Sequence, residues 1–241
     1  MTAVGPAGSA RAGADPWPGV SADLEQQGYA IPQIPLLTPD ECAELREHFD
    51  DDGMFRSTVD MARYRFGLGT YRYYAYDLPP VVAAIREAAY PALAVLANAW
   101  NERMGQRYRY PPELEEFLEH CHDAGQVRPT PLILRYGEGG FNTLHQDLYG
   151  EIAFPFQLTV ALTEPGVDFT GGENLFVEAR PRAQSRGTAV TVPLGHAVVF
   201  PTRHRPVAGA RGHYRATIRH GVSTVTSGTR VCLGIIFHDA T

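Results

Sequence analysis

From Pro131 to the C-terminus, short runs of β-forming residues alternate with glycine- and proline-rich turns, and this pattern restricts the fold more than any other feature of the chain. Many short strands at close spacing are typical of a β-sandwich or barrel. Seven segments qualify as candidate strands: 132–136, 156–162, 173–179, 188–192, 197–200, 214–222 and 230–237.

The part of the chain before Pro131 is expected to be mainly helical. Thr38 can cap a helix whose first residue is Pro39, and further helices are predicted over 81–103 and 111–122. We therefore predict an α+β protein with helices packed on one sheet. Its predicted organisation is a disordered leader over residues 1–18 and a single domain over 19–241, with a helical support over 19–130 and a β core over 131–241.

The composition excludes several classes of chemistry. All 21 basic residues are Arg, so Schiff-base and Walker A lysine chemistry is impossible. The net charge is −6, yet nine Arg and no carboxylate lie between Glu178 and Asp239, which predicts a locally positive stretch. Three widely spaced cysteines form neither a disulfide framework nor a CxxC metal site. Without a signal-peptide pattern or a run of about 18 apolar residues, we expect a soluble cytoplasmic protein without a membrane partner.

The segment over residues 64–80 is unusually aromatic, with arginines interleaved among six Tyr and Phe residues. One interpretation is an edge strand that packs its rings on the core. The other is a substrate-facing lid, in which Tyr71, Tyr73 and Tyr76 stack planar groups and Arg72 pairs with an anion.

A candidate metal site begins at His145 and Asp147. Residues two apart on a strand point the same way, so the two side chains would project together. A second histidine from a distant strand would complete the two-His-one-carboxylate arrangement that binds Fe(II) with open positions. By itself, the His-x-Asp pair could equally be a hydrogen-bonded surface pair.

Two histidines compete for the third ligand position. His220 lies on a late β run, ten residues before Arg230, and the chain then makes one turn into its last strand. His204 is also followed by an arginine at a similar spacing, Arg215 eleven residues later. We favour His220, because its position before the closing pair of strands suits the fold. An arginine so placed is the cation that the far carboxylate of 2-oxoglutarate requires.

These residues, in this order, resemble the Fe(II)- and 2-oxoglutarate-dependent oxygenases. The likeness rests on the HxD motif, the Gly171-Gly172-Glu173 turn, a glycine before an apolar strand, and the distal histidine with its arginine. The resemblance implies a double-stranded β-helix of jelly-roll or cupin-like type, with Fe(II), 2-oxoglutarate and O₂ as cofactor and cosubstrates. It also implies that His145, Asp147 and His220 bind iron, and that Arg230 and Tyr136 bind 2-oxoglutarate.

Within these oxygenases, the chain looks most like a bacterial subfamily described as acting on damaged DNA by oxidative demethylation. The likeness rests on the segments HQDLYGE, DFTGGENLFVEARPRAQSR and RHGVS. That description rests on a likeness to the AlkB-type DNA dealkylases. These enzymes usually have Asn two positions before the tyrosine that corresponds to Tyr136, whereas this chain has Leu134. Its ten-residue spacing from His220 to Arg230 looks instead like that of prolyl hydroxylases.

Two substrate classes therefore stay open. An alkylated nucleic acid would use the arginines over 180–219 and stacking tyrosines, whereas a small molecule such as an amino acid or specialised metabolite would place an anion on the same arginines. A non-catalytic cupin-like metal sensor is a third alternative, and the oligomeric state is left open. Candidate substrate-facing residues are Tyr71, Arg72, Tyr73, Tyr76, Gln146, Tyr149, His204 and Arg215.

Overall fold

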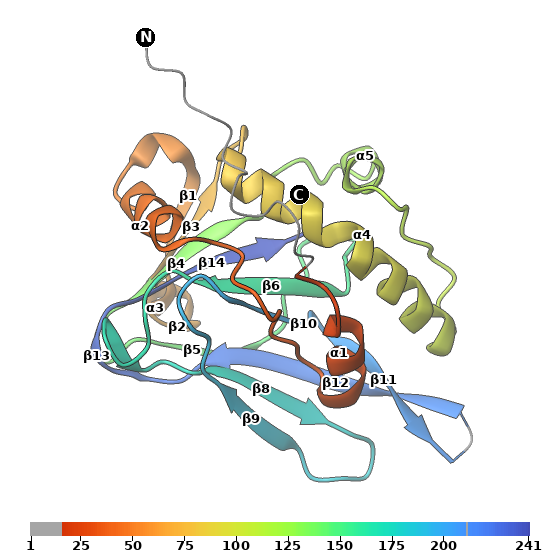
Figure 1. Ribbon diagram of the computed structural model, residues 1–241. Helices are drawn as coiled ribbons and strands as arrows, with labels where there is room; N and C mark the ends of the chain where they lie inside the picture. The colour runs from red at the N-terminus through yellow and green to blue at the C-terminus, as the bar shows by residue number, and fades with distance from the viewer. Residues whose placement is uncertain (1–15, 211) are drawn as a thin grey trace.

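The computed structural model describes residues 16–210 and 212–241 and consists of two facing antiparallel sheets with helices against one of them (Figure 1). The helices are α1 (Val20–Gln27), α2 (Pro39–His48), the 3₁₀ helix η1 (Asp52–Met54), α3 (Met61–Tyr64), α4 (Pro80–Arg103) and α5 (Leu114–Asp123). The strands are β1 (Phe55–Asp60), β2 (Gly67–Leu68), β3 (Thr70–Tyr74), β4 (Leu132–Tyr136), β5 (Phe141–His145), β6 (Phe156–Ala161), β7 (Phe169–Gly171), β8 (Asn174–Ala179), β9 (Arg186–Val190), β10 (Ala197–Pro201), β11 (His204–Gly209), β12 (Gly212–Val222), β13 (Val225–Gly228) and β14 (Arg230–Ile236).

Each of the two main sheets has six strands. In one, all six form a continuous series in the order β1-β3-β4-β14-β6-β10, and we call it the larger sheet. In the other, which we call the smaller sheet, five strands form the series β2-β5-β12-β8-β9 and β11 lies off this series. The hairpin partner β11 pairs with the first half of β12, and β7 pairs with β13. All seven candidate strands of the sequence analysis are strands, with ends shifted by at most a few residues. The short strands β2, β7, β11 and β13 lack a clear alternating pattern of their own and were missed.

The main core lies between the helices and the larger sheet. In β14, Val231, Leu233 and Ile235 belong to the same buried cluster as Ile85 and Trp100 of α4. Figure 1 shows α4 running across this sheet, whereas none of the described helices lies on the outer face of the smaller sheet. Burial of each large apolar side chain contributes about 1.5–3 kcal/mol, so this layer is the main source of stability. The predicted packing of helices on one sheet is confirmed.

Helix α2 begins where the sequence predicts. Thr38 Oγ1 accepts a hydrogen bond from the Glu41 backbone N–H at 3.2 Å, and the Glu41 carboxylate accepts one from the Thr38 N–H at 2.8 Å. This reciprocal capping box satisfies two N–H groups that have no partner within the helix.

The region before Pro131 is less purely helical than predicted, because β1 and β3 extend the larger sheet. The aromatic segment contributes β2, which lies at the edge of the smaller sheet, and β3. Strand β3 carries the tyrosines and lies between β1 and β4, so the tyrosine-bearing strand is an interior strand and not the expected edge strand. Its side chains alternate: Tyr71 and Tyr73 face the space between the sheets, and Arg72 and Tyr74 face the opposite side.

Most of the predicted leader, residues 1–15, lies outside the described residues. Of the remainder, Trp17 is half-buried and packs against the helical core, so it belongs to the folded part of the chain, contrary to the prediction.

Helix α4 is, by length and composition, apolar enough to cross a membrane, which the sequence analysis had not recognised. Half of its most apolar window is buried inside the protein, and its apolar residues pack on the larger sheet. This packing identifies α4 as the central helix of the core.

Candidate active site

A cavity of about 230 Å³ lies between the two sheets. The larger sheet contributes side chains of β3, β4, β6 and β14, and the smaller sheet contributes side chains of β5, β8 and β12. The wall is mainly aromatic and aliphatic, and its polar lining residues include His145, Asp147, His220 and Arg230. An apolar cavity with a few converging polar groups is typical of an active site.

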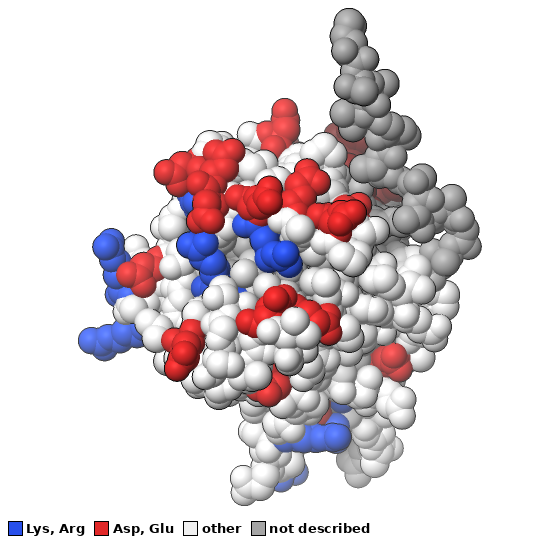
Figure 2. Space-filling model, turned by 60° about the vertical axis from the view of Figure 1, so that its left-hand side comes forward, with Lys and Arg blue, Asp and Glu red and all other residues white. Residues whose placement is uncertain are grey.

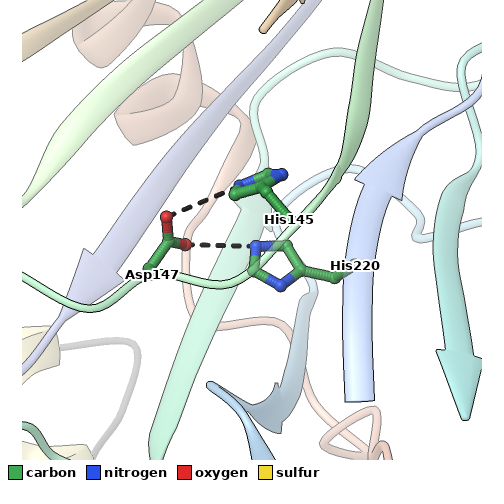
Figure 3. Close-up of side chains that lie close together, drawn as sticks. All are labelled: His145, Asp147 and His220. Carbon is green, nitrogen blue, oxygen red and sulfur yellow. Dashed lines mark ion pairs between the residues drawn. The ribbon is translucent and has the colours of Figure 1, made fainter. Parts of the chain in front are cut away.

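Pairing of β5 with β12 brings the two histidines of the cavity together. His145, the last residue of β5, is the direct partner of His220 on β12, and their ring centroids are 4.2 Å apart. Asp147 lies to one side of the two rings and faces both: its Oδ2 is 3.1 Å from His220 Nε2, and its Oδ1 is 3.5 Å from His145 Nε2 (Figure 3). The sequence predicts Asp147 on the same strand as His145, but β5 ends at His145 and Asp147 lies in the loop that follows.

The tautomer of His145 is suited to metal binding. Its Nδ1–H donates to the Thr143 carbonyl oxygen at 2.7 Å, so the lone pair of Nε2 faces Asp147. Burial lowers the pKa of His220, against the opposing effect of Asp147, and favours the neutral ring that a metal requires. Burial alone would raise the pKa of Asp147, but His220, His145 and Tyr149 together hold it well below its usual range. The site therefore offers two imidazole nitrogens and one carboxylate.

This donor set fits Fe(II). One ligand atom from each of His145, Asp147 and His220 lies within 4.8 Å of the others, and two histidines with one carboxylate form the set typical of non-haem Fe(II) oxygenases. Among residues 16–210 and 212–241, no other group of three His, Cys, Asp or Glu side chains meets this criterion. Asp147 is only 8% exposed and has no arginine among its contacts, so a bound cation would supply the charge that this carboxylate lacks.

Arg230 enters the same cavity from β14. It is buried, its Nη2 donates to Asn174 Oδ1 at 3.0 Å, and its guanidinium lies 5.4 Å from the ring centroid of Tyr136. Tyr136 on β4 is its direct strand partner, and both residues line the cavity. Only glycine fits at position 172. A Cβ there would lie 2.9 Å from Arg230 Cδ, and the backbone φ of +66° is in the left-handed region that favours glycine. Arg230 is thus held in one orientation.

Two polar residues that contact the predicted site residues are absent from the sequence predictions. Asn174 holds the Arg230 guanidinium, and Gln157 on β6 places its Nε2 3.2 Å from His220 Nε2. Asn174 directly follows the Gly-Gly-Glu turn, which could have drawn attention to it. Gln157 has no motif around it and is recognisable only once β6 is known to face β12.

Four of the candidate substrate-facing residues line the cavity: Tyr71, Tyr73, Gln146 and Tyr149. Gln146 Nε2 donates to the Ile218 carbonyl at 2.9 Å, and the Tyr149 hydroxyl donates to Asp147 Oδ1 at 2.6 Å. The structure therefore places all four near the metal site, and their contact with a substrate stays a prediction.

Arg72 and Tyr76 lie elsewhere, contrary to the prediction. The Arg72 guanidinium is buried against the Phe49 carbonyl, with Asp52 as its ion-pair partner, because its position on β3 points away from the cavity. The Tyr76 hydroxyl donates to Asp239 Oδ2 at 2.7 Å in a separate cluster.

His204 and Arg215 also lie outside the cavity. His204 begins β11 opposite Thr217 and is not part of the group formed by His145 and its partners, so the structure supports His220 as the third ligand. Arg215 is exposed on the β11–β12 hairpin, where its Nη2 contacts the Met104 carbonyl at 3.3 Å. Both residues were chosen by sequence spacing, which does not reveal that this hairpin extends beyond the cavity.

Two arginines of the arginine-rich stretch are buried and do not contribute to a basic surface. Arg205 pairs with Glu178, which also pairs with Arg180, and Arg230 is inside the cavity. The exposed arginines of the stretch that the structure describes are Arg180, Arg182, Arg186, Arg203, Arg215 and Arg219. On the face drawn in Figure 2, acidic and arginine side chains are interspersed.

Exposed apolar residues surround part of the cavity mouth, and we call Tyr64, Phe66, Leu68 and Phe141 the apolar rim. Their exposed fractions range from 37% to 60%, and the rings of Tyr64 and Phe66 are stacked with centroids 5.6 Å apart. Phe66 also lines the cavity, and Leu68 pairs directly with Phe141. Clustered exposed apolar side chains mark binding surfaces.

A family model described as "Oxygenase, catalysing oxidative methylation of damaged DNA" matches residues 69–240. An uncharacterized protein of Mycobacterium tuberculosis, present in two strains, is 47% identical over 181 residues, which cover 73% of this chain and 78% of the relative.

Solved structures of similar fold include a Pseudomonas putida prolyl-4-hydroxylase, with TM-score 0.51 and 17% identity, covering 92% of this chain and 98% of that one. A Burkholderia pseudomallei oxidoreductase of the 2OG-Fe(II) oxygenase family has TM-score 0.54 and 16% identity, with 96% of each chain covered. A Trichoplax adhaerens prolyl hydroxylase in complex with a peptide of hypoxia inducible factor has TM-score 0.53 and 15% identity, covering 91% of this chain and 87% of that one. The chain shares the fold of these proteins.

Proposed function

The chain belongs to the Oxygenase-NA family, and on this basis we propose that it is an Fe(II)- and 2-oxoglutarate-dependent dioxygenase that hydroxylates a C–H bond of its substrate. The observation that carries the proposal is the meeting of His145, Asp147 and His220 in a cavity that also contains a buried arginine. Membership of an oxygenase family favours this enzyme over the non-catalytic metal sensor.

In this proposal His145, Asp147 and His220 hold the iron. When bound, iron and 2-oxoglutarate supply the activation of O₂, with oxidation of 2-oxoglutarate to succinate and CO₂ and hydroxylation of a C–H bond. The Arg230 guanidinium pairs with the distal carboxylate of 2-oxoglutarate, because it is the one cation among the residues that line the cavity. Tyr136 stays a neutral hydrogen-bond donor beside it, since burial raises its phenol pKa far above the usual value.

The cavity walls keep water from the reacting atoms. Leu132, Leu134, Phe176 and Phe200 supply an apolar lining around the polar cluster, which protects an oxidising site from side reactions. We further propose that the two sheets form a double-stranded β-helix, with residues 19–241 acting as one domain. All three cysteines are buried free thiols, which suits a reducing compartment such as the cytoplasm.

For the substrate, we propose a methylated base of a single-stranded nucleic acid, from which hydroxylation of the N-methyl group releases formaldehyde. The family description supports this choice, as does the apolar rim, where Tyr64 and Phe66 alternate with exposed Arg63 and Arg65. Stacked aromatic side chains with neighbouring arginines bind single strands by base stacking and phosphate pairing.

A small-molecule substrate is the second candidate. It is favoured by the modest cavity of about 230 Å³ and by the pairing of Arg180 and Arg205 with Glu178, which removes them from any phosphate track.

The cofactor site is tested first, by adding 2-oxoglutarate to the anaerobic Fe(II)-loaded protein. We expect a visible charge-transfer band, weaker apparent 2-oxoglutarate affinity in Arg230→Ala, and no band in His220→Ala. Absence of the band in the wild-type protein would overturn the proposed function.

The substrate is tested by measuring formaldehyde release and binding anisotropy with methylated single-stranded and double-stranded oligonucleotides. We expect the single strand to be preferred, and the double variant Tyr64→Ala/Phe66→Ala to weaken its binding by about 2–6 kcal/mol for two lost stacking contacts. Val95→Ala is the control, because Val95 is an exposed apolar residue of α4, on the other side of the larger sheet. A protein that forms the charge-transfer band but neither binds nor demethylates the oligonucleotides acts on the small-molecule class instead.

A further inference from the structure

Tyr149 makes a short contact with the carboxylate of the metal site. Its hydroxyl donates to Asp147 Oδ1 at 2.6 Å, whereas the other carboxylate oxygen, Oδ2, faces His220 Nε2 at 3.1 Å. Both oxygens also face a candidate ligand nitrogen, because Oδ1 lies 3.5 Å from His145 Nε2 (Figure 3). Of the two, Oδ1 is the one that accepts the hydrogen bond of the phenol, and Oδ2 lies closer to its histidine.

The phenol of Tyr149 is fixed in place by its surroundings. Its ring packs edge-on against Tyr73, with centroids 6.3 Å apart, and lies 6.1 Å from the ring of His238. In its contact with Asp147 the phenol is the donor, because a carboxylate oxygen can only accept.

The loop that carries Tyr149 is anchored to the end of the chain. Gln126 Oε1 accepts from the Ile152 N–H at 2.8 Å, and Gln126 Nε2 donates to the Ile152 and Asp239 carbonyls at 2.9 and 2.6 Å. Gly150 lies directly against this amide, and a Cβ at Gly150 would approach the Gln126 side chain to 2.3 Å. The loop after Asp147 is thus held by a buried side chain from outside the cavity.

We propose that Tyr149 is a positioning residue of the metal site, whose hydroxyl occupies Asp147 Oδ1 and leaves Oδ2 as the single carboxylate oxygen for the metal. This inference rests on the proposed function. A carboxylate that used both oxygens would take an additional coordination position, and the two-His-one-carboxylate site must keep its open positions for 2-oxoglutarate and O₂. Hydrogen bonds to ligands in this way set both their orientation and the metal affinity.

The test compares Tyr149→Phe with Tyr76→Phe. Each substitution removes a tyrosine hydroxyl that donates a hydrogen bond to a buried aspartate. Tyr76 donates to Asp239, which lies outside the cavity. Co(II) binding to the metal-free protein is followed through its visible d–d bands, whose intensity reports the coordination number. We expect Tyr149→Phe to lower Co(II) affinity about tenfold and to change the band intensity, and Tyr76→Phe to alter neither. Urea unfolding in EDTA establishes that both variants are folded.

A folded Tyr149→Phe protein that binds Co(II) within about twofold of the wild type, with the same spectrum, would overturn the inference and leave the proposed function intact. A wild-type protein that binds neither Co(II) nor Fe(II) would instead overturn the proposed function. If Tyr149→Phe does not fold, Gly150→Ala provides the second variant, since it displaces the loop and keeps the phenol. The inference then requires Gly150→Ala to change the Co(II) spectrum, and an unchanged spectrum would contradict it.

Discussion

Two buried aspartates of this protein are surrounded by the same types of side chain. Asp147 contacts two histidines and the hydroxyl of Tyr149, and Asp239 contacts His122 and the hydroxyl of Tyr76. The difference is Arg86, which pairs with Asp239 at 2.8 Å and also donates to the Ile236 and Phe237 carbonyls. Asp239 therefore has an arginine as its permanent counter-charge, and Asp147 has none among the residues that the structure describes.

This difference separates a structural cluster from a ligand site. A buried charge is tolerated when a partner compensates it, and removal of that partner is costly. At Asp239 the partner is permanent, and the cluster ties α4 and α5 to the end of the chain. At Asp147 the neighbours are two imidazole rings and a phenol, none of which carries a permanent positive charge, so a bound cation would supply that charge.

The largest expected effect is at Asp147. Substitution Asp147→Asn should abolish Fe(II)-dependent turnover of 2-oxoglutarate, because the amide brings no charge to the metal. In EDTA it should lower the free energy of unfolding less than Asp239→Asn does, because it leaves no buried arginine without its charge partner. Succinate formation and urea unfolding measure the two quantities. A loss of stability in EDTA as large as that of Asp239→Asn would show that Asp147 is structural in the manner of Asp239.

Substitution Asp239→Asn should lower the stability of the protein and leave its metal binding unchanged. It leaves the buried Arg86 without its charge partner and should lower the free energy of unfolding by about 3–5 kcal/mol. Urea unfolding at neutral pH measures this loss. Co(II) affinity of the folded fraction should stay at the wild-type value, and a loss of metal affinity as large as that of Asp147→Asn would remove the distinction between the clusters.

His238 lies beside both clusters and predicts a pH dependence. Burial, then the charge of Arg86, lowers its pKa from 6.5 to about 4. Between these values the unfolded chain binds the proton and the folded protein does not, so stability falls as the pH drops from about 6.5 to about 4. At roughly 1.4 kcal/mol per pKa unit, the loss reaches about 3 kcal/mol. Urea unfolding across this range measures it.

The control for this pH dependence is His238→Gln, whose amide oxygen can still accept from the Phe154 N–H that His238 Nδ1 receives in the wild type. The variant should show a flatter profile between pH 4 and 6.5. An equally steep profile would assign the acid sensitivity to another group.

The smallest expected effect is that of Tyr76→Phe. Loss of one hydrogen bond to a buried charge should lower the free energy of unfolding by about 1–2 kcal/mol, because Arg86 still compensates Asp239. Thermal or urea unfolding detects this change. A null effect would mean that water replaces the hydroxyl at this half-exposed tyrosine.

The comparison also explains what the sequence could predict. His145, Asp147, His220 and Arg230 were found because their order and spacing follow the strands that carry them, and the hydrophobic runs of those strands are clear. The Asp239 cluster could not be found, because Arg86 and Asp239 are joined only by the packing of α4 on the end of the chain, and neither lies in a motif. Arg72 was misplaced because an alternating strand does not reveal which of its faces points toward the cavity.

The buried position of strand β14 determines which opening motions of the protein can disrupt the cosubstrate site. All seven of its residues are buried, with Arg230 and Cys232 directed at the cavity and Leu233 and Ile235 directed at the helical core. A strand in the centre of a core opens only in global unfolding, and its amides exchange with solvent most slowly. The cosubstrate site is therefore built on the part of the molecule that opens last, so the free energy of ligand binding is added to the global unfolding free energy and not merely to a local fluctuation.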